Sequence, residues 1–255
     1  MPADASLETR DLTIRFGGQV AVDRVSCRFH PGTLTAIVGP NGAGKTTYFN
    51  LLSGQLRPSA GDIFFSGERI TRMSAPRRAR LGLGRAFQLT NLFPDLSVLE
   101  NVRLAVQARA GEGLDMIGLA ADRHALTGAA EAVLARVRLA DRAGTVAASL
   151  SHGDQRKLEV GMLIALEPAV FLFDEPTAGM SSAEVPVILE LIEELRTEPG
   201  RTILLVEHKM DVVRRLADRV IVLHQGALVA DGEPAEIVAS KVVREAYLGI
   251  RADAV

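Results

Sequence analysis

Gly39-Pro40-Asn41-Gly42-Ala43-Gly44-Lys45-Thr46 is the stretch that decides the fold. It follows an apolar run, Leu34–Val38, typical of a buried strand, and it precedes a helical run, Lys45–Leu52. The segment fits the pattern G-x-x-x-x-G-K-[ST], in which glycines let backbone N–H groups surround a phosphate while the lysine supplies a mobile cation. The order of strand, turn and helix predicts a phosphate site at a helix N-terminus, with Thr46 as a ligand of Mg²⁺.

Further strands and helices are predicted on both sides of this turn. Before residue 66, short β-branched or apolar runs indicate strands at Leu12–Phe16, Val20–Phe29 and Asp62–Phe65. From about Leu92 to Leu166 the pattern becomes helical, with Val98, Val102 and Val106 four residues apart. Alternation then resumes with strands Ala169–Phe173, Thr202–Val206 and Val220–Leu223 and helices Ala183–Leu195 and Met210–Ala217. We therefore expect an α/β fold with a parallel sheet and an inserted helical subdomain.

Composition limits the classes of protein that fit. The 255 residues are 47% apolar and 24% charged with a net charge of −2, which is typical of a globular chain and argues against a general nucleic-acid binder. Cys27 is the only cysteine, so we expect no intramolecular disulfide and a reducing compartment. The first eight residues lack the features of a signal peptide, and the longest apolar stretch is interrupted by Glu167 and Pro168.

Two acids follow a second buried strand. Val170–Phe173 is wholly apolar and leads into Asp174 and Glu175. Because ligands of parallel sheets collect at the carboxyl ends of strands, Asp174 is predicted to hold Mg²⁺ and Glu175 to accept a proton from an attacking water. The alternative is that these acids only cap the following turn.

Two other segments have a simple structural interpretation beside a functional one. Ser151, within Leu150–Asp154, is a preferred helix N-cap for the helix that begins near Gln155. An arginine-rich segment precedes the helical part, and we expect it to be a solvated face; the alternative is a contact with an acidic partner or lipid headgroups. Its arginines are Arg69, Arg72, Arg77, Arg78, Arg80 and Arg85.

The order of these motifs resembles the ATP-binding cassette ATPases. The Walker A motif of that family is similar to Gly39–Thr46, its signature sequence to Leu150–Asp154, and its Walker B motif with the following glutamate to Val170–Glu175. Its Q-loop glutamine and switch histidine correspond to Gln88 and His208. The resemblance implies a P-loop NTPase fold, with a RecA-like core, an antiparallel β-subdomain and an α-helical subdomain. The whole chain, 1–255, would be one nucleotide-binding domain, with the core and β-subdomain in 1–86 and 169–255 and the helical subdomain in 87–168.

The resemblance also implies the roles of individual residues. Lys45, Gln88, Glu175 and His208 would be catalytic, and Thr46, Gln88 and Asp174 would hold Mg²⁺. ATP would contact Phe16, Gly39, Pro40, Asn41, Gly42, Ala43, Gly44, Lys45, Thr46 and Thr47. Phe16 would stack on adenine, although a core phenylalanine at a strand end is the alternative. Ser151 and Gly153 would touch ATP bound to a second cassette, which is either an identical chain or a homologous ATPase subunit.

Several stretches are similar to one branch of the family. Leu92–Val102 and Val243–Gly249 look like the subfamily that energises uptake of branched-chain amino acids, whereas Leu150–Gly153 and Ala178–Met180 look like its urea-uptake branch. The partners implied are membrane permease subunits and, indirectly, a solute-binding protein, at the cytoplasmic face of the inner membrane and without nucleic acid. Gln88 and the loop that follows it, to Leu96, are expected to dock on a membrane subunit.

Three residues depart from the family pattern. His152 replaces the first glycine of the signature, Asp154 replaces a glutamine, and Ser181 stands where an aspartate is common. We therefore expect these residues to affect the rate of ATP turnover but not the chemistry of hydrolysis. Two alternatives to an importer subunit are a soluble cassette ATPase not coupled to transport and a regulatory cassette that no longer hydrolyses ATP. The presence of Lys45, Asp174, Glu175 and His208 together argues against the regulatory alternative.

Overall fold

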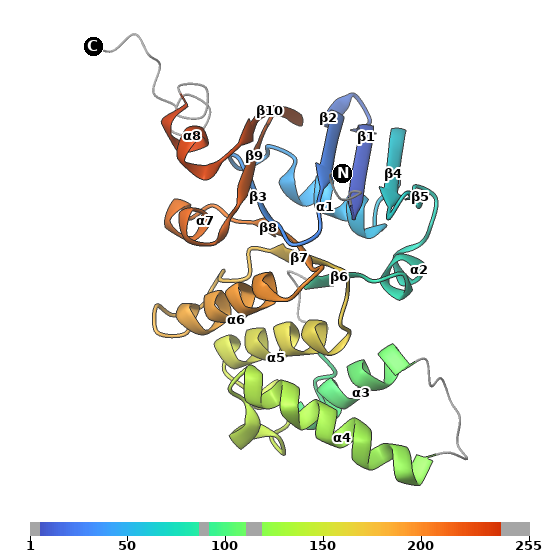
Figure 1. The fold of residues 1–255 in the computed structure, drawn as a ribbon, viewed down its shortest axis with the longest axis vertical. Coiled ribbons are helices and arrows are strands. Elements are labelled where there is room, and N and C mark those ends of the chain that lie inside the picture. Colours follow the sequence, from blue (N-terminus) through green and yellow to red (C-terminus); the bar gives the residue numbers. More distant parts are fainter. Residues whose placement is uncertain (1–5, 87–91, 111–118, 241–255) are drawn as a thin grey trace. The chain divides into compact units, whose positions relative to one another are not determined.

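The computed structural model describes residues 6–86, 92–110 and 119–240, which form two compact units (Figure 1). The first, here called the core unit, lies within residues 1–83, 169–175 and 195–255. The second, here called the helical unit, lies within 84–168 and 176–194. Each is described by itself below.

A six-stranded sheet in the order β10-β9-β3-β8-β7-β6 is built from the described residues. Strands β9, β3, β8 and β7 run parallel to one another, and β10 runs antiparallel to β9. Their bounds are β3 Leu34–Val38, β6 Leu83–Ala86, β7 Val170–Asp174, β8 Thr202–Val206, β9 Arg219–His224 and β10 Ala227–Gly232. Every residue of β3, β7 and β8 is buried, as expected for parallel strands covered on both faces. The predicted α/β class is therefore confirmed.

Helices cover both faces of this sheet in the core unit. Successive side chains of a strand point to opposite faces, and β3 shows the division. Ile37 packs in one cluster with residues of α1 (Lys45–Ser53), whereas Ala36 and Val38 pack in another. The second cluster contains Val213 of α7 (Met210–Leu216) and Ile237 of α8 (Pro234–Ala239).

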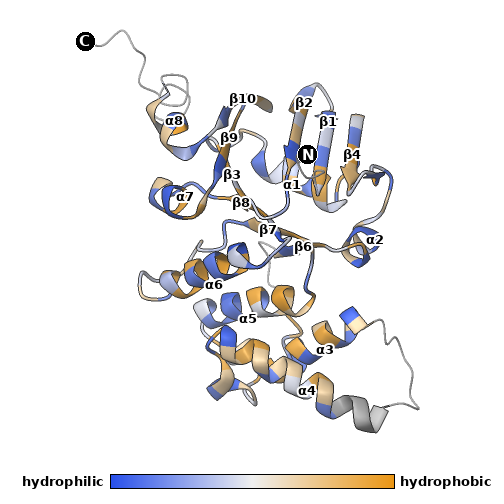
Figure 2. Cartoon of the chain, viewed as in Figure 1, coloured by the Kyte–Doolittle hydropathy of each residue, from blue (hydrophilic) through white to orange (hydrophobic). Residues whose placement is uncertain are grey.

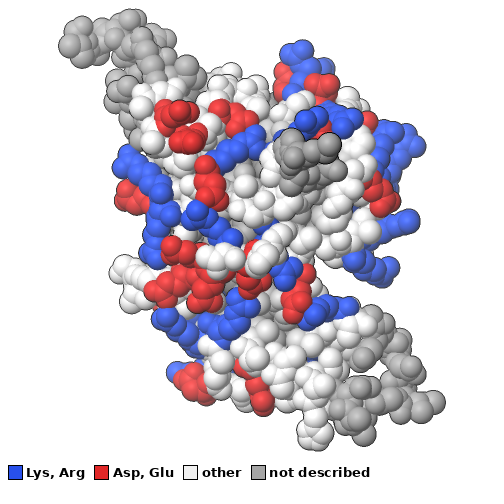
Figure 3. All heavy atoms as spheres, in the orientation of Figure 1, with Lys and Arg blue, Asp and Glu red and all other residues white. Residues whose placement is uncertain are grey.

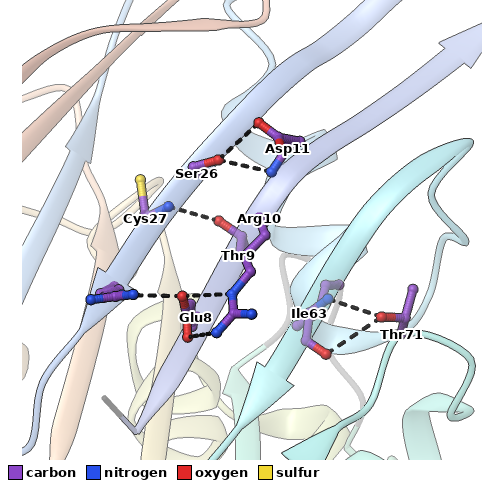
Figure 4. A network of polar contacts seen from close by, with 9 residues as sticks. Glu8, Thr9, Arg10, Asp11, Ser26, Cys27, Ile63 and Thr71 are labelled. Carbon is purple, nitrogen blue, oxygen red and sulfur yellow. Dashed lines mark hydrogen bonds and ion pairs between the residues drawn. The ribbon is translucent and has the colours of Figure 1, made fainter. Parts of the chain in front are cut away.

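A second sheet, antiparallel and in the order β2-β1-β4-β5, adjoins α1. Its strands are β1 Leu7–Phe16, β2 Gln19–Phe29, β4 Ala60–Phe65 and β5 Glu68–Arg69. Figure 4 shows how polar groups join the strands: the Thr9 hydroxyl accepts the N–H of Cys27 at 3.0 Å. The same hydroxyl also bonds the Tyr48 hydroxyl of α1 at 2.9 Å. The sheet is thus attached to the helix that follows the phosphate-binding turn.

The arginine-rich segment is only partly a solvated face. It forms β5 and the short helix α2 (Ala75–Arg80), and within it Arg78 is 1% exposed. The Arg78 guanidinium donates to four backbone oxygens: those of Leu51 and Leu52 at the end of α1, both at 2.7 Å, and those of Thr71 (3.0 Å) and Met73 (3.1 Å). The expectation of solvent exposure is wrong for Arg78, because the end of α1 and its neighbours leave carbonyl groups that a buried donor must satisfy.

The helical unit is built around α3 (Val98–Ala110), α4 (Leu119–Arg136) and α5 (His152–Ala165), which contact one another. Two short 3₁₀ turns, η1 (Ala140–Arg142) and η2 (Ala147–Ser149), and the first part of α6 (Val185–Thr197) belong to it. Val98, Val102 and Val106 are buried, as their spacing predicts. Figure 2 shows hydrophobic residues interspersed with hydrophilic ones along these helices. No helix in the described part of the chain is long and apolar enough to cross a membrane.

Candidate functional site

The phosphate-binding turn joins β3 to α1 and depends on two close backbone approaches. A Cβ at Gly39 would lie 2.1 Å from the carbonyl oxygen of Leu223, and a Cβ at Gly44 would lie 2.4 Å from that of Ala21. Both glycines also have positive φ, 153° and 98°. Only glycine fits these two positions, so the backbone can curve around a small anion at the N-terminus of α1.

Lys45 lies across this turn. Its Nζ donates to the carbonyl oxygens of Gly39 at 2.6 Å and Pro40 at 3.0 Å, and the residue is 8% exposed. Burial lowers the pKa of Lys45, while the carboxylates of Glu175 and Asp174 oppose this shift. A partly desolvated ammonium group close to two acids is well placed to bind phosphate oxygens.

One cleft of about 460 Å³ in the core unit brings together residues that lie far apart in the sequence. Its lining residues are Phe16, Gln19, Val20, Ala21, Asn41, Gly42, Ala43, Gly44, Lys45, Thr46, Thr47, Glu175 and Gln225. Phe16 is 51% exposed, so the alternative of a core phenylalanine is wrong. An exposed aromatic ring beside a phosphate loop offers a face on which a planar base can stack.

The two acids lie where the strand order predicts. Asp174 ends β7, is fully buried, and pairs in register with Val206 of β8. The N–H of Glu175 extends this pairing by donating to the Val206 oxygen at 3.0 Å. Glu175 has a φ of 48°, a backbone conformation that is strained for a non-glycine residue, and its side chain is 29% exposed. The Asp-Glu pair thus combines one buried and one accessible carboxylate.

His208 lies beside Glu175 because it follows the neighbouring strand. Its Nδ1 is 3.9 Å from Glu175 Oε1 and 3.4 Å from Glu207 Oε1. The fully buried Glu207 carboxylate accepts the backbone N–H groups of His208 (3.0 Å) and Lys209 (3.1 Å). Glu207, for which the sequence pattern predicts no role, therefore fixes the loop that carries the histidine.

The helical unit holds the other candidate segment. Ser151 caps α5 and accepts the N–H of Asp154 at 3.1 Å, so the N-cap interpretation is confirmed. Next to it, an ideal Cβ on Gly153 would be 1.8 Å from Glu184 Oε1, and one on Gly179 would be 3.0 Å from the His152 ring. These two contacts pack the N-terminus of α5 closely against residues 179–184.

Residues 22–178 match the family model described as ABC transporter. The chain belongs to the ABC transporter family. It is 36% identical over 248 residues to the high-affinity branched-chain amino acid transport ATP-binding protein LivG of Escherichia coli (strain K12), covering 95% of this chain and 97% of LivG. It is 37% identical over 250 residues to BraF of Pseudomonas aeruginosa, a protein with the same description, with the same coverage. The chain is thus an ABC transporter ATPase domain.

Solved ABC cassettes share its fold. A nucleotide-free ATP-binding cassette from an ABC transporter superimposes with a TM-score of 0.82 at 26% identity, over 96% of this chain and all of that one. A cassette in its ADP conformation gives 0.81 at 27% identity, over 96% and 99%. The fold implied by the resemblance, a P-loop NTPase, is confirmed by these neighbours.

Some residues of the candidate site were missed by the sequence predictions or lie outside the described residues. Gln88 lies outside the described residues, as do residues 89–91 of the loop that follows it, whereas residues 92–96 are described. Gln19 faces Phe16 across the hairpin between β1 and β2, and Gln225 lies in the turn between β9 and β10 with a φ of 49°. The pairing of Gln19 with Phe16 was open to prediction from the Gly17-Gly18 turn, whereas nothing local in the sequence places Gln225 beside the phosphate loop.

Proposed function

We propose that this chain binds and hydrolyses ATP as the energy-supplying subunit of a membrane importer. The observation that carries the proposal is that one cleft is lined by Phe16, the phosphate loop and Glu175 together. Phe16 would stack on adenine at one end, and the loop with Lys45 would hold the phosphates. Glu175 would face the reacting γ-phosphate.

Hydrolysis would use groups that the core unit already holds in place. The Glu175 carboxylate accepts a proton from a water molecule, whose oxygen attacks the γ-phosphorus. The bond from that phosphorus to the bridging oxygen breaks, and ADP and phosphate are formed. Lys45 balances charge on the phosphate oxygens, and His208 lies 3.9 Å from the base and so can help to orient it.

Mg²⁺ fits the oxygen donors at this site. The Thr46 hydroxyl and the Asp174 carboxylate are hard ligands of the kind that Mg²⁺ prefers, and Gln88 is the third residue assigned to it. In the described residues no group of three or more His, Cys, Asp and Glu could hold a metal ion, which agrees with an ion that takes most ligands from water and phosphate. Bound Mg²⁺ would neutralise charge on the phosphates.

A second cassette would complete each ATP site. Ser151 and Gly153 lie at the N-terminus of α5, a 14-residue helix, where backbone N–H groups and the helix dipole favour an anion. We assign them to the γ-phosphate of ATP bound by the partner cassette. The partner is an identical chain or a homologous ATPase subunit.

The class of solute is inferred from the relatives of the chain. LivG and BraF carry branched-chain amino acid transport in their names, and at 36% and 37% identity they support the same solute class here. Urea, suggested by Leu150–Gly153 and Ala178–Met180, is the second candidate. The further partners are permease subunits and, indirectly, a solute-binding protein, which would hold the chain at the cytoplasmic face of the membrane.

An exposed apolar pair supports contact with the permease subunits. Phe93 and Leu96 are 49% and 36% exposed, just before α3. Asn101 holds this loop, since its side chain accepts the N–H of Phe93 at 2.8 Å and donates to the oxygens of Phe93 (3.1 Å) and Ser97 (2.9 Å). A fixed apolar projection of this kind suits an amphipathic helix of a partner.

The test of hydrolysis compares Glu175→Gln with the parental chain. The variant keeps the size and hydrogen bonding of the side chain but loses the base, so turnover should fall by about 10²–10⁴-fold while ATP binding persists. With ATP it should elute as a dimer in size-exclusion chromatography, whereas Lys45→Ala should not. The control is Glu233→Gln, at an exposed acid outside the cleft. Hydrolysis by Glu175→Gln at the parental rate would refute the assignment.

Transport requires a separate test in the source organism. Cells that lack the gene should lose uptake of labelled leucine, and the parental gene should restore it while Glu175→Gln should not. Loss of urea uptake alone would select the second solute. If neither uptake changes while the purified chain hydrolyses ATP, the alternative of a soluble ATPase not coupled to transport replaces the importer.

A further inference from the structure

Exposed arginines without acidic partners gather on one part of the core unit. Most of the arginines elsewhere in the described residues pair with an acid, for example Arg10 with Glu8 at 2.8 Å and Arg219 with Asp231 at 2.5 Å. Residues 57–80 are different, because they contain six arginines and two acids, a net charge of +4 in a chain whose net charge is −2. Among these arginines, the side chains of Arg57, Arg72, Arg77 and Arg80 are exposed, and none has an ion pair or hydrogen bond to another described residue. Figure 3 shows the blue Lys and Arg atoms over β4, β5 and α2 at the right-hand edge.

Three of the arginines line a hollow of about 630 Å³ that is separate from the ATP cleft. These are Arg57, Arg69 and Arg72, and the chain from Pro58 to Gly61 forms another part of its wall. At roughly 30 Å³ per water molecule the hollow has room for about twenty waters, more than a single small ion requires. It is therefore large enough for a polar group of several atoms.

One side of the hollow is held in place by hydrogen bonds. Arg69 Nε donates to Asp62 Oδ1 at 2.6 Å, and the buried Thr71 hydroxyl donates to the same oxygen at 3.0 Å. The Thr71 hydroxyl also accepts the N–H of Ile63 at 2.9 Å, so β4 and the segment after β5 are joined (Figure 4). Asp62 is thereby engaged with Arg69, which leaves Arg57 and Arg72 as the uncompensated charges.

The ligand that matches these features carries a phosphate but no base. Guanidinium groups bind phosphate oxygens through paired N–H donors. None of the described residues that line the hollow is aromatic, so it offers no stacking face for a nucleobase, in contrast to the ATP cleft with Phe16. The basic surface also continues onto α2 with Arg77 and Arg80, three residues apart on one helix face. A charged surface wider than one hollow suits an array of lipid headgroups better than a single soluble ligand.

We propose that Arg57 and Arg72 form a binding site for the phosphate headgroup of an anionic lipid, with Arg77 and Arg80 extending the contact. The site gives the chain a contact with the membrane that is its own and does not depend on permease subunits. Failure of this proposal would therefore leave the assignment as an importer ATPase unaffected.

The test is cosedimentation of the purified chain with vesicles of phosphatidylcholine, with and without phosphatidylglycerol. Binding should require phosphatidylglycerol and should weaken as sodium chloride is raised. Each arginine near an anionic surface contributes about fivefold to binding, so Arg72→Gln should reduce it about fivefold and Arg57→Gln with Arg72→Gln about 25-fold. ATP binding should not change in either variant.

Arg214→Gln is the matched control, because Arg214 is also exposed without a partner among the described residues but lies on α7. Its binding should stay close to parental, and an equal loss in Arg214→Gln and Arg72→Gln would overturn the proposal in favour of unspecific attraction.

A second arm uses glycerol 3-phosphate. If it binds in an Arg72-dependent way while vesicles do not bind, the ligand is a soluble phosphate and the lipid site is refuted. Loss of permease association in Arg72→Gln, with vesicle binding unchanged, would likewise refute it and indicate an acidic protein partner.

Discussion

Replacing Arg78 with Met should destabilise the core unit by about 3 kcal/mol, although residue 78 lies outside the ATP cleft. The guanidinium makes four hydrogen bonds to backbone oxygens, two of them at the end of α1. Hydrogen bonds to a charged group contribute roughly 1.5–3 kcal/mol each, so their loss costs about 6 kcal/mol at the lower end. Methionine fills much of the same space but leaves these carbonyl groups without their donor.

Relief of desolvation opposes this loss. Burial lowers the pKa of Arg78 from its ordinary value to about 10, which still leaves the group charged at pH 7. A shift of that size corresponds to roughly 3 kcal/mol of unfavourable burial, which the substitution removes. The difference is about 3 kcal/mol in favour of the parental chain. The hydrogen bonds therefore stabilise the chain by more than burial of the charge destabilises it.

Urea unfolding followed by circular dichroism measures this difference. Arg77→Met is the matched control, because Arg77 is adjacent and exposed and its side chain has no partner among the described residues. Arg78→Lys keeps the charge with fewer donors and should fall between the two, which preserves the test if the methionine variant does not fold. If Arg78→Met unfolds within about 0.5 kcal/mol of Arg77→Met, a range ordinary for surface substitutions, the reasoning fails.

Three further outcomes are expected. Phe16→Ala should weaken ATP binding about tenfold in titration calorimetry with little change in melting temperature, because the ring is half exposed; unchanged affinity would remove the adenine assignment. Gly179→Ala should destabilise the chain by about 1–2 kcal/mol, since the position has a φ of 73° and the new Cβ would crowd His152, and His152→Ala in the same chain should recover part of that loss. No recovery would show that this contact is loose. Burial raises the pKa of Cys27 to about 11, so at pH 8 only about one thiol in a thousand is ionised and iodoacetamide should react rapidly only after unfolding.

The sheet at the centre of the core unit was predictable because its strands are buried on both faces. The predicted strands Leu34–Val38 and Thr202–Val206 have the same bounds as β3 and β8. A short apolar run bounded by polar residues is typical of a buried strand. The edge strand β10 was missed because Ala227–Gly232 is half exposed and contains Asp and Gly, which are uncommon in strands. Helix α2 was missed for a related reason, since four of its six residues are Arg or Pro.

The residues of the candidate site could be predicted where a short sequence motif carries them. They could not be predicted where their role depends on contacts with the backbone or with residues far away in the sequence. The phosphate loop carries its chemistry in eight consecutive residues. The role of Glu207 could not be predicted from the sequence. Its carboxylate holds the His208 loop through two backbone N–H groups, and this contact is visible only once the backbone is known. The burial of Arg78 was hidden for the same reason, since its partners Leu51 and Leu52 lie more than 25 residues away in sequence.

Residues 169–175, which include both acids, divide the helical unit into two segments of the sequence. This limits which segments can be exchanged between related proteins. The chain enters the core unit between Pro168 and Ala169 and leaves it again between Glu175 and Pro176. A chimera that replaced only residues 84–168 would assemble its helical unit from two parents, because residues 176–194 belong to the same unit and Arg156 Nε donates to the Pro176 oxygen at 3.1 Å. A functional graft must replace both segments and leave residues 169–175 in place, joined at each end through a proline that restricts the backbone.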